Sequence, residues 1–253
     1  DEGEADGDEG AAPEQGGQKG LGITGPAGSR QRGHGREGKG SGGTPNGCLG
    51  LSGYFGGPVP MAQSPLHEQL RSIYKLSEKD CARVLPLFEP LQVKKNGHLF
   101  EAGAVVRHVY FVERGCLRQY YVNADAEERT IYFKMENGWV SELVSFLDRT
   151  PTELNVQAVE DSSLQVIDRK NWVYIMTQVP LMTMGFIRAQ QDTNYMLKKR
   201  LAEGTIETPE EKYLRFAREE PELLRRIPLY LIATYLAMTP ETLSRIRRQV
   251  AHR

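Results

Sequence analysis

The chain has 253 residues, a formal net charge of −1 and a hydrophobic content of 39%. No apolar run approaches the roughly 18 residues that a membrane-spanning helix requires. The three cysteines (Cys48, Cys81 and Cys116) are scattered and form no CxxC pair, which argues against a disulfide framework and a cysteine-rich metal site. We therefore expect a protein of the reducing cytoplasm, with no cofactor and no membrane partner.

Residues 1–60 differ in composition from the rest of the chain. They hold 20 of the 26 glycines and few large apolar residues. Such a segment buries too little apolar surface to offset its ordering entropy, so we expect it to be disordered. The favoured interpretation is an extension upstream of a start at Met61, and a functional tail is the alternative.

Two short helices are predicted first, within residues 64–90. Ser64 precedes a proline at the start of the first helix, and Ser77 is a capping serine for the second. From Leu91 to about Ile167 the sequence changes to short β-rich runs that are separated by turn signals. This spacing predicts a sandwich or barrel of antiparallel strands.

A long helix is predicted from Pro180 to about Ala202. One stripe of this helix, at spacings of three and four, consists of Met184, Ile187, Gln191, Asn194, Leu197 and Leu201. Polar residues in the middle of an apolar stripe are typical of the layer that sets register in a two-stranded coiled coil. We therefore favour a dimerisation helix, and a helix packed only on its own barrel remains the alternative.

The C-terminal part is predicted to be helical and basic. A capping box at Thr208 and Glu211 opens one helix. Its expected buried side comprises Tyr213, Leu214, Phe216 and Ala217. Residues 240–253 carry four arginines and one glutamate, a balance that suits contact with a phosphate backbone.

Residues 229–250 predict a helix-turn-helix. Thr239 can cap the second helix, and Pro240 suits its first position. The predicted buried positions are Ile232, Leu236, Met238, Leu243 and Ile246. On the second helix, Glu241, Arg245 and Arg248 share the face opposite to Leu243, Ile246 and Val250. That arrangement presents polar side chains to a major groove.

The order of these elements resembles the Crp/Fnr superfamily of bacterial transcription regulators, over about residues 64–250. In the sensor half, residues 96–103, residues 109–112 and Gly115 are similar to the strand and turn motifs of the family. In the reading half, residues 239–246 are similar to its recognition helix. The resemblance implies an α+β protein with a β-roll sensor domain, a jelly roll of the cyclic-nucleotide-binding type (residues 61–179). A dimerisation helix (180–203) and a helix-turn-helix domain (204–253) would follow.

The resemblance also implies a DNA interface. The expected DNA-binding residues are Thr239, Pro240, Glu241, Thr242, Arg245 and Arg248. The base-contacting glutamate and arginine of the family correspond to Glu241 and Arg245, and Pro240 stands where the family usually has an arginine. Expected partners are double-stranded DNA and a second copy of the chain, with RNA polymerase as a further candidate.

The effector pocket implied by the family departs from the cyclic-nucleotide pattern. The Gly-Glu pair that holds the ribose reads Ser141-Glu142, and the Arg-Ser/Thr pair that grips the phosphate reads Thr152-Glu153. The pair lacks the guanidinium that would bind the phosphate, and the Glu153 carboxylate would repel it, so we do not expect cyclic AMP to bind. Another small-molecule effector, or none, would then occupy this pocket.

Other sensor classes and functions fit less well. Cys81 alone cannot hold an iron–sulfur cluster, and His67, His98 and His108 are haem-ligand candidates only by residue type. A cupin-like oxygenase would need clustered histidines with a carboxylate, so we do not expect an enzyme. The remaining alternative is a cyclic-nucleotide-binding-like module that acts through protein partners rather than DNA.

Overall fold

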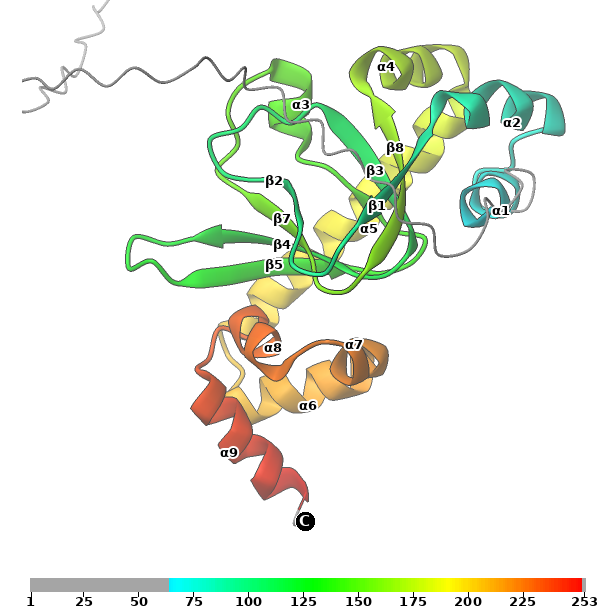
Figure 1. Cartoon of the computed structure of the whole chain (residues 1–253). Coiled ribbons are helices and arrows are strands. Elements are labelled where there is room, and N and C mark those ends of the chain that lie inside the picture. Colours follow the sequence, from blue (N-terminus) through cyan, green and yellow to red (C-terminus); the bar gives the residue numbers. More distant parts are fainter. Residues whose placement is uncertain (1–63, 252–253) are drawn as a thin grey trace, which may run out of the picture. The chain divides into compact units, whose positions relative to one another are not determined.

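The computed structural model describes residues 64–251, which lie within one compact unit of the chain, residues 50–253 (Figure 1). The expectations for residues 1–60 and for Met61 fall outside the described residues. Among the described residues, no helix combines the length and apolar character needed to cross a bilayer.

Two short helices precede the strands, as predicted. Ser64 caps α1 (Pro65–Ser72) by accepting a hydrogen bond from the His67 amide, and Ser77 caps α2 (Glu78–Val84) through the Asp80 amide. A 3-10 turn, η2 (Leu85–Leu87), then leads into the first strand. Each cap satisfies amide groups that have no partner inside the helix.

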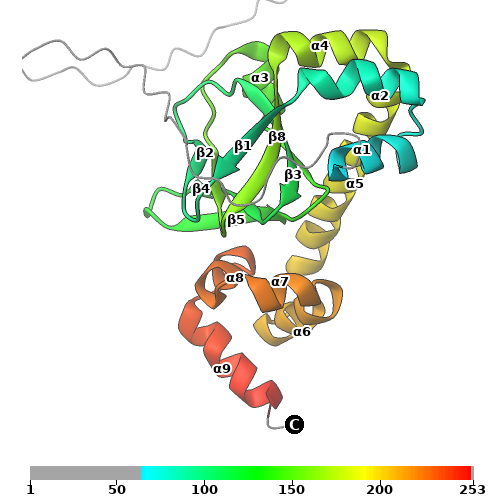
Figure 2. The same cartoon turned by 45° about the vertical axis from the view of Figure 1, so that its right-hand side comes forward.

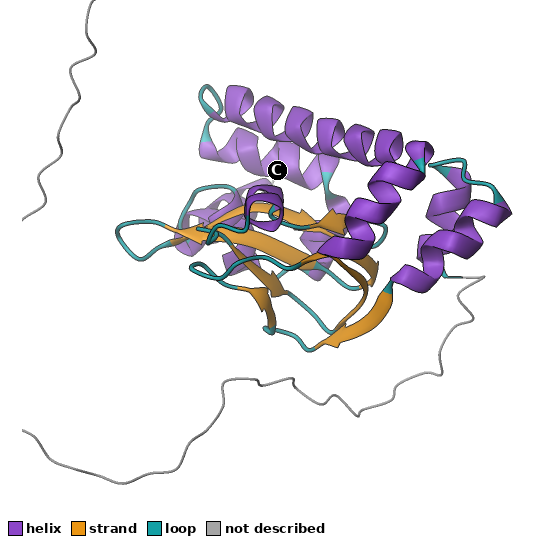
Figure 3. Cartoon of the chain, turned by 90° about the horizontal axis from the view of Figure 1, so that it is seen from above, coloured by secondary structure: helices purple, strands orange, loops and turns teal. Residues whose placement is uncertain are grey.

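The strands form two four-stranded sheets in which all paired strands are antiparallel. The strands are β1 (Glu89–Val93), β2 (His98–Phe100), β3 (His108–Arg114), β4 (Leu117–Val122), β5 (Glu128–Lys134), β6 (Trp139–Val140), β7 (Asn155–Ala158) and β8 (Ser162–Asp168). Their orders are β1-β8-β3-β6 and β2-β7-β4-β5. Figure 3 shows the strands, in orange, grouped together with the helices outside them. The predicted α+β fold with a β-roll is confirmed.

Three elements of this part were not predicted from the sequence: β6, α3 (Leu143–Asp148) and α4 (Arg169–Gln178). Strand β6 has only two residues, too few to show the alternation of apolar and polar residues that predicts a strand. Its Trp139 nevertheless lies at the centre of an aromatic cluster. The ring of Trp139 lies 5.1 Å from that of Phe111 and 6.0 Å from those of Phe88 and Trp172. Its indole nitrogen donates to Gln69 Oε1 at 2.9 Å. Through Gln69 and Trp172, these contacts hold α1 and α4 against the sheet.

Helix α5 (Pro180–Gly204) is the predicted long helix. Its inner side packs on the β-roll through Met182 and Phe186, and the Phe186 ring meets that of Trp172 at 4.6 Å. Gly185 is required on this side, because a Cβ there would lie 2.3 Å from the Tyr74 ring. The remaining elements are α6 (Pro209–Glu219), α7 (Pro221–Arg226), α8 (Leu229–Tyr235) and α9 (Pro240–Ala251), shown from a second side in Figure 2.

The capping box of α6 is confirmed, since Thr208 and Glu211 exchange hydrogen bonds. Tyr213 and Phe216 are buried, whereas Leu214 is exposed, so its expected burial was wrong. Pro221 ends α6 as its missing amide hydrogen requires, and it also opens α7, which was not predicted.

The C-terminal helices pack on the β-roll. An apolar cluster joins Cys116, Phe133 and Val159 of the β-roll to α6–α9, and the Phe133 and Tyr235 rings lie 5.5 Å apart. Beside this cluster, Arg226 of α7 binds Glu136 through two hydrogen bonds of 2.8 and 2.9 Å. Arg226 also bonds Glu160, and the amide of Gly115 donates to Glu136 at 2.8 Å. We call this group the Arg226 clasp.

Replacing Arg226 with alanine should lower the free energy of unfolding by about 1–3 kcal/mol, because two partly buried carboxylates lose their partner. Burial acts to raise the pKa of Glu136, but hydrogen bonds from Arg226 and the Gly115 amide outweigh it and lower the pKa to about 2. This stabilisation should therefore be complete above about pH 4.5, the ordinary value, and should disappear as the pH falls towards 2.

Urea denaturation between pH 7 and pH 3 would measure this effect. Arg225→Ala is the matched control, because Arg225 is the exposed neighbour on α7. If Arg226→Ala and Arg225→Ala have the same free energy of unfolding at pH 7, the Arg226 clasp does not stabilise the fold.

Candidate nucleic-acid interface and effector site

Helices α8 and α9, joined by a short turn, occupy the residues for which the sequence predicts a helix-turn-helix. Ala237 in the turn adopts a positive φ of 54°, which reverses the chain between the two helices. Thr239 Oγ1 accepts a hydrogen bond of 3.2 Å from the Thr242 amide and so caps α9. Pro240 occupies the first position of α9, where its missing amide hydrogen is not needed.

One side of α9 is buried against α6 and α8. Leu243 and Ile246 are buried and Val250 is half-buried. On α8, Ile232 and Ala233 are fully buried, so the small Ala233 side chain allows close packing of the helices. The predicted apolar pattern is confirmed, with Met238 only half-buried.

The opposite side of α9 is exposed. Glu241, Arg245 and Arg248 lie on it and, among residues 64–251, none of them forms an ion pair. Helical spacing adds Ser244 and Gln249, two exposed residues that we did not select from the sequence. The alternation of apolar and polar residues could have identified both. We call these five residues the α9 outer face.

A second exposed surface follows α5. Its large apolar side chains with their exposed fractions are Met184 (63%), Ile187 (45%), Tyr195 (66%) and Leu201 (72%). Gln191 and Asn194 are exposed between them, whereas Leu197 is half-buried. We call this surface the α5 ridge. Tyr195 was not part of the predicted stripe, although its position on the helical wheel places it there.

In the sensor half, Ser141 and Glu142 lie between β6 and α3. Ser141 Oγ donates to the His108 carbonyl at 3.1 Å. The Glu142 carboxylate accepts hydrogen bonds from the Val144 and Ser145 amides, at 3.1 and 2.7 Å, and thus caps α3. Both carboxylate oxygens are therefore engaged with the protein itself, at the helix end where an anion would otherwise be favoured.

Thr152 and Glu153 lie in the segment between α3 and β7. Thr152 is buried, and its Oγ1 accepts a hydrogen bond of 3.0 Å from the Leu154 amide. Glu153 is exposed. No hydrogen bond joins these residues to Ser141 or Glu142 within the described part of the chain. The expected second pair therefore offers no guanidinium to a phosphate, and the Thr152 hydroxyl is buried.

A cavity of about 140 Å³ lies between β6 and α5, and Ser141 is the member of the expected set that lines it. Its other walls include Tyr132, Trp139 and Asn194. Neither Thr152 nor Glu153 borders this cavity, so the structure does not unite the four predicted effector residues in it.

The three histidines considered as haem ligands each lie beside another side chain. His98 Nε2 lies 3.0 Å from the Tyr120 hydroxyl, and burial lowers the pKa of His108. His67 lies 3.4 Å from a Glu78 oxygen. Within residues 64–251, no three His, Cys, Asp or Glu side chains are grouped as metal ligands would be.

Cyclic AMP should not bind at physiological concentrations, because Thr152 and Glu153 stand where the family has its phosphate-binding pair and because Glu142 already caps α3. Titration calorimetry with cyclic AMP up to about 1 mM should give no saturable signal. Cyclic GMP would serve as a second probe of the same phosphate chemistry. Saturable binding in the micromolar range would contradict this interpretation and would direct attention to the exposed Arg149 at the end of α3.

Residues 90–178, from β1 to the end of α4, match the cyclic nucleotide-binding domain family. No curated protein matches the chain. Solved structures do match, and most of the length of each is covered. FixK2 from Bradyrhizobium japonicum is 18% identical with a TM-score of 0.54, over 65% of this chain and 85% of that one.

A CooA mutant from Carboxydothermus hydrogenoformans is 19% identical with a TM-score of 0.56, over 75% of this chain and 85% of its own. A protein from Eubacterium rectale, described as a transcriptional regulator of the crp/fnr family, is 16% identical with a TM-score of 0.56, over 69% and 83%. At these identities the likeness establishes a common fold.

Proposed function

The chain is of the Crp/Fnr type in fold and contains a cyclic nucleotide-binding domain, and from this premise we propose that it is a dimeric, sequence-specific DNA-binding regulator of transcription. The observation that carries the proposal is the α9 outer face. Its charged side chains are exposed without ion pairs inside the described chain, on a helix whose other side is buried.

The chemistry of this face suits a major groove. An arginine forms two parallel hydrogen bonds with guanine, and a glutamate accepts one from the amino group of cytosine. Glu241 and Arg245 are one helical turn apart near the start of α9, which is the end that usually enters the groove. We assign base contacts to both residues.

Contacts to phosphate would position the helix. Arg248 lies one turn beyond Arg245, and we assign it to the phosphate backbone. Thr239, Pro240 and Thr242 form the entry of α9, where hydroxyl groups can also reach phosphate oxygens. Arg247 is exposed, but helical spacing places it beside Leu243 at the edge of the buried side, so we assign it no base.

Dimerisation is proposed through the α5 ridge. Several large apolar side chains in one line along a helix are an unusual surface for a monomer. The exposed Gln191 and Asn194 would form a polar layer between two such helices and set their register. A second copy would then supply the second recognition helix for a two-fold-symmetric site.

Selection of bound fragments from random double-stranded DNA with the full chain tests the proposal. A recovered motif of two symmetric half-sites, with centres about one helical turn apart, is the expected result. Affinity for the motif should fall steeply with rising salt, because phosphate contacts release counterions. Failure to enrich any motif would favour the alternative, a module that acts through protein partners.

A further inference from the structure

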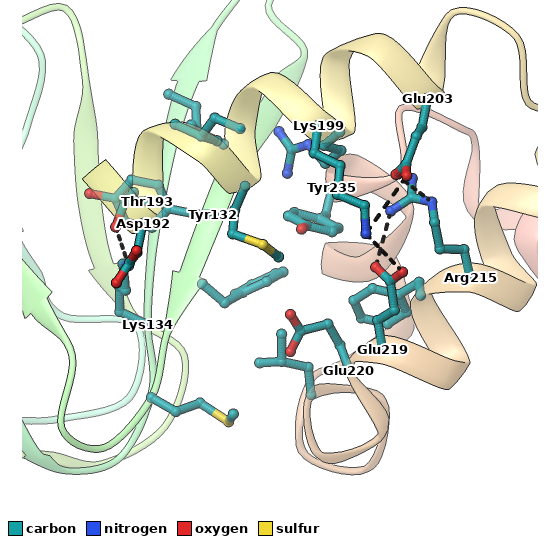
Figure 4. Close-up of a pocket in the computed structure, with 18 of the residues that line it drawn as sticks. Tyr132, Lys134, Asp192, Thr193, Lys199, Glu203, Arg215, Glu219, Glu220 and Tyr235 are labelled. Carbon is teal, nitrogen blue, oxygen red and sulfur yellow. Dashed lines mark hydrogen bonds and ion pairs between the residues drawn. The ribbon is translucent and has the colours of Figure 1, made fainter. Parts of the chain in front are cut away.

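A cavity of about 300 Å³ lies between β5, α5 and the junction of α6 with α7 (Figure 4). None of the four effector residues expected from the sequence lines it, although Tyr132, Lys134 and Thr193 also border the neighbouring 140 Å³ cavity. Ligand pockets in proteins start at about this size. Part of its wall is apolar and comes from Phe133, Met135, Phe216 and Leu223. The cavity thus has walls from both the β-roll and the C-terminal helices.

Most of the charges around this cavity neutralise each other. Arg215 lies 3.3 Å from Glu203 and 3.7 Å from Glu219, and Lys199 lies 3.7 and 3.3 Å from the same two carboxylates. The guanidinium of Arg200 lies over the Tyr235 ring at 4.3 Å. Lys199, Glu203, Arg215 and Glu219 form a polar side of the cavity, shown on the right of Figure 4.

Lys134 is different. It projects from β5, its Nζ donates a hydrogen bond of 3.0 Å to Thr193 Oγ1, and it lies 5.2 Å from the centre of the Tyr132 ring. Within the described residues no carboxylate forms an ion pair with it. Burial lowers its pKa, and the negative charge of Glu220 opposes this change. Lys134 is therefore a half-buried cation with an incomplete set of partners.

Glu220 is its counterpart on the other side. It stands at the α6–α7 junction immediately before Pro221, and its carboxylate caps neither helix. Within residues 64–251 it has no ion-pair partner. Burial and the nearby Glu219 raise its pKa, and Lys134 opposes them. Lys134 and Glu220 thus influence each other electrostatically across the cavity without direct contact.

We propose that this cavity binds a free α-amino acid with an apolar side chain. The carboxylate of the ligand would accept hydrogen bonds from the Lys134 ammonium group, which Thr193 Oγ1 orients, and the ammonium group of the ligand would pair with Glu220. The side chain would lie against Phe133, Met135, Phe216 and Leu223. Such a ligand complements both isolated charges at once, which neither a simple anion nor a simple amine can do.

This inference does not depend on DNA binding, and its test uses none. Titration calorimetry on the full chain with L-leucine, L-methionine and L-phenylalanine should give saturable binding by at least one of them, with a Kd of about 1 mM or tighter. 4-Methylpentanoate and 3-methylbutylamine, which lack the amino and the carboxyl group of leucine, should each bind at least about tenfold more weakly than L-leucine.

Lys134→Met and Glu220→Gln should each weaken binding of the preferred amino acid by about tenfold or more. Thr193→Val removes only the hydroxyl group and provides a milder variant if Lys134→Met folds poorly. Lys198→Met and Glu222→Gln are matched controls, because both residues are exposed and neither borders the cavity. Both controls should bind as the unaltered protein does.

The proposal is overturned if none of the three amino acids binds at about 10 mM, a concentration well above the expected Kd. It is equally overturned if 4-methylpentanoate binds as tightly as L-leucine, or if the folded Lys134 and Glu220 variants bind as the controls do. Thermal denaturation of each variant without ligand would establish that it is folded. The two proposals can fail separately. If the protein binds none of these amino acids but still selects a DNA motif, the ligand proposal fails and the proposed function stands.

Discussion

Glutamate substitutions at Ile187 and Leu201 together should convert the protein into monomers that keep a folded β-roll. Both side chains are exposed on the α5 ridge, so charge there costs little in the monomer but cannot be buried between two helices. Affinity for DNA with two half-sites should fall by about 10²–10⁴-fold. A monomer carries one recognition helix, so it loses the gain in affinity that a dimer obtains by binding both half-sites at once. Sedimentation and DNA titration would measure the two effects.

Leu197 is a poorer target for the same experiment. It is half-buried and borders the cavities on the inner side of α5, so a charge there would also disturb packing within one chain. Ile73→Glu is a suitable control, because Ile73 is a similarly exposed apolar residue at the end of α1. A double variant that still sediments as a dimer would locate the interface elsewhere.

Alanine at Arg245 should cost about 1–3 kcal/mol per half-site and relax the preference for one base pair, because the guanidinium is lost from a base edge. Alanine at Arg248 should instead weaken binding to all sequences alike. It should also reduce the slope of log affinity against log salt by roughly one per subunit, which is the signature of a lost phosphate contact.

Affinities for a library of single-base variants, measured at several salt concentrations, would separate the two roles. Arg83→Ala is the control, because Arg83 is an exposed arginine on α2 that pairs with Asp80. If Arg245→Ala leaves the base preference unchanged, α9 does not enter the groove by its first turn. Pro240, which replaces an arginine usual in the resembling family, would then be the first residue to examine.

The sequence determined the elements whose cause is local. Ser64, Ser77, Thr208 and Thr239 each cap a helix through the amide three residues later, and such signals are visible in the chain itself. The β-rich runs between turn signals located seven of the eight strands, and apolar residues at helical spacing located the long α5 and the helices α8 and α9.

Elements whose cause is distant were missed. Strand β6 exists because Trp139 fills a space among Phe88, Phe111 and Trp172, residues that are up to about 50 positions away. Leu214 looked buried by its apolar character, but no neighbouring element covers it in the described chain. Burial depends on what packs against a face, and one helix does not contain that information.

The candidate sites divide in the same way. The sequence by itself determined the α9 outer face, because the side that Leu243 and Ile246 bury also decides which side is exposed. Only the tertiary structure decided that Arg226 meets Glu136, 90 positions away, and that Lys134 and Glu220 border one cavity. The spacing of apolar residues along one helix shows which side of that helix is exposed. Charged groups on different elements interact only after folding brings those elements together.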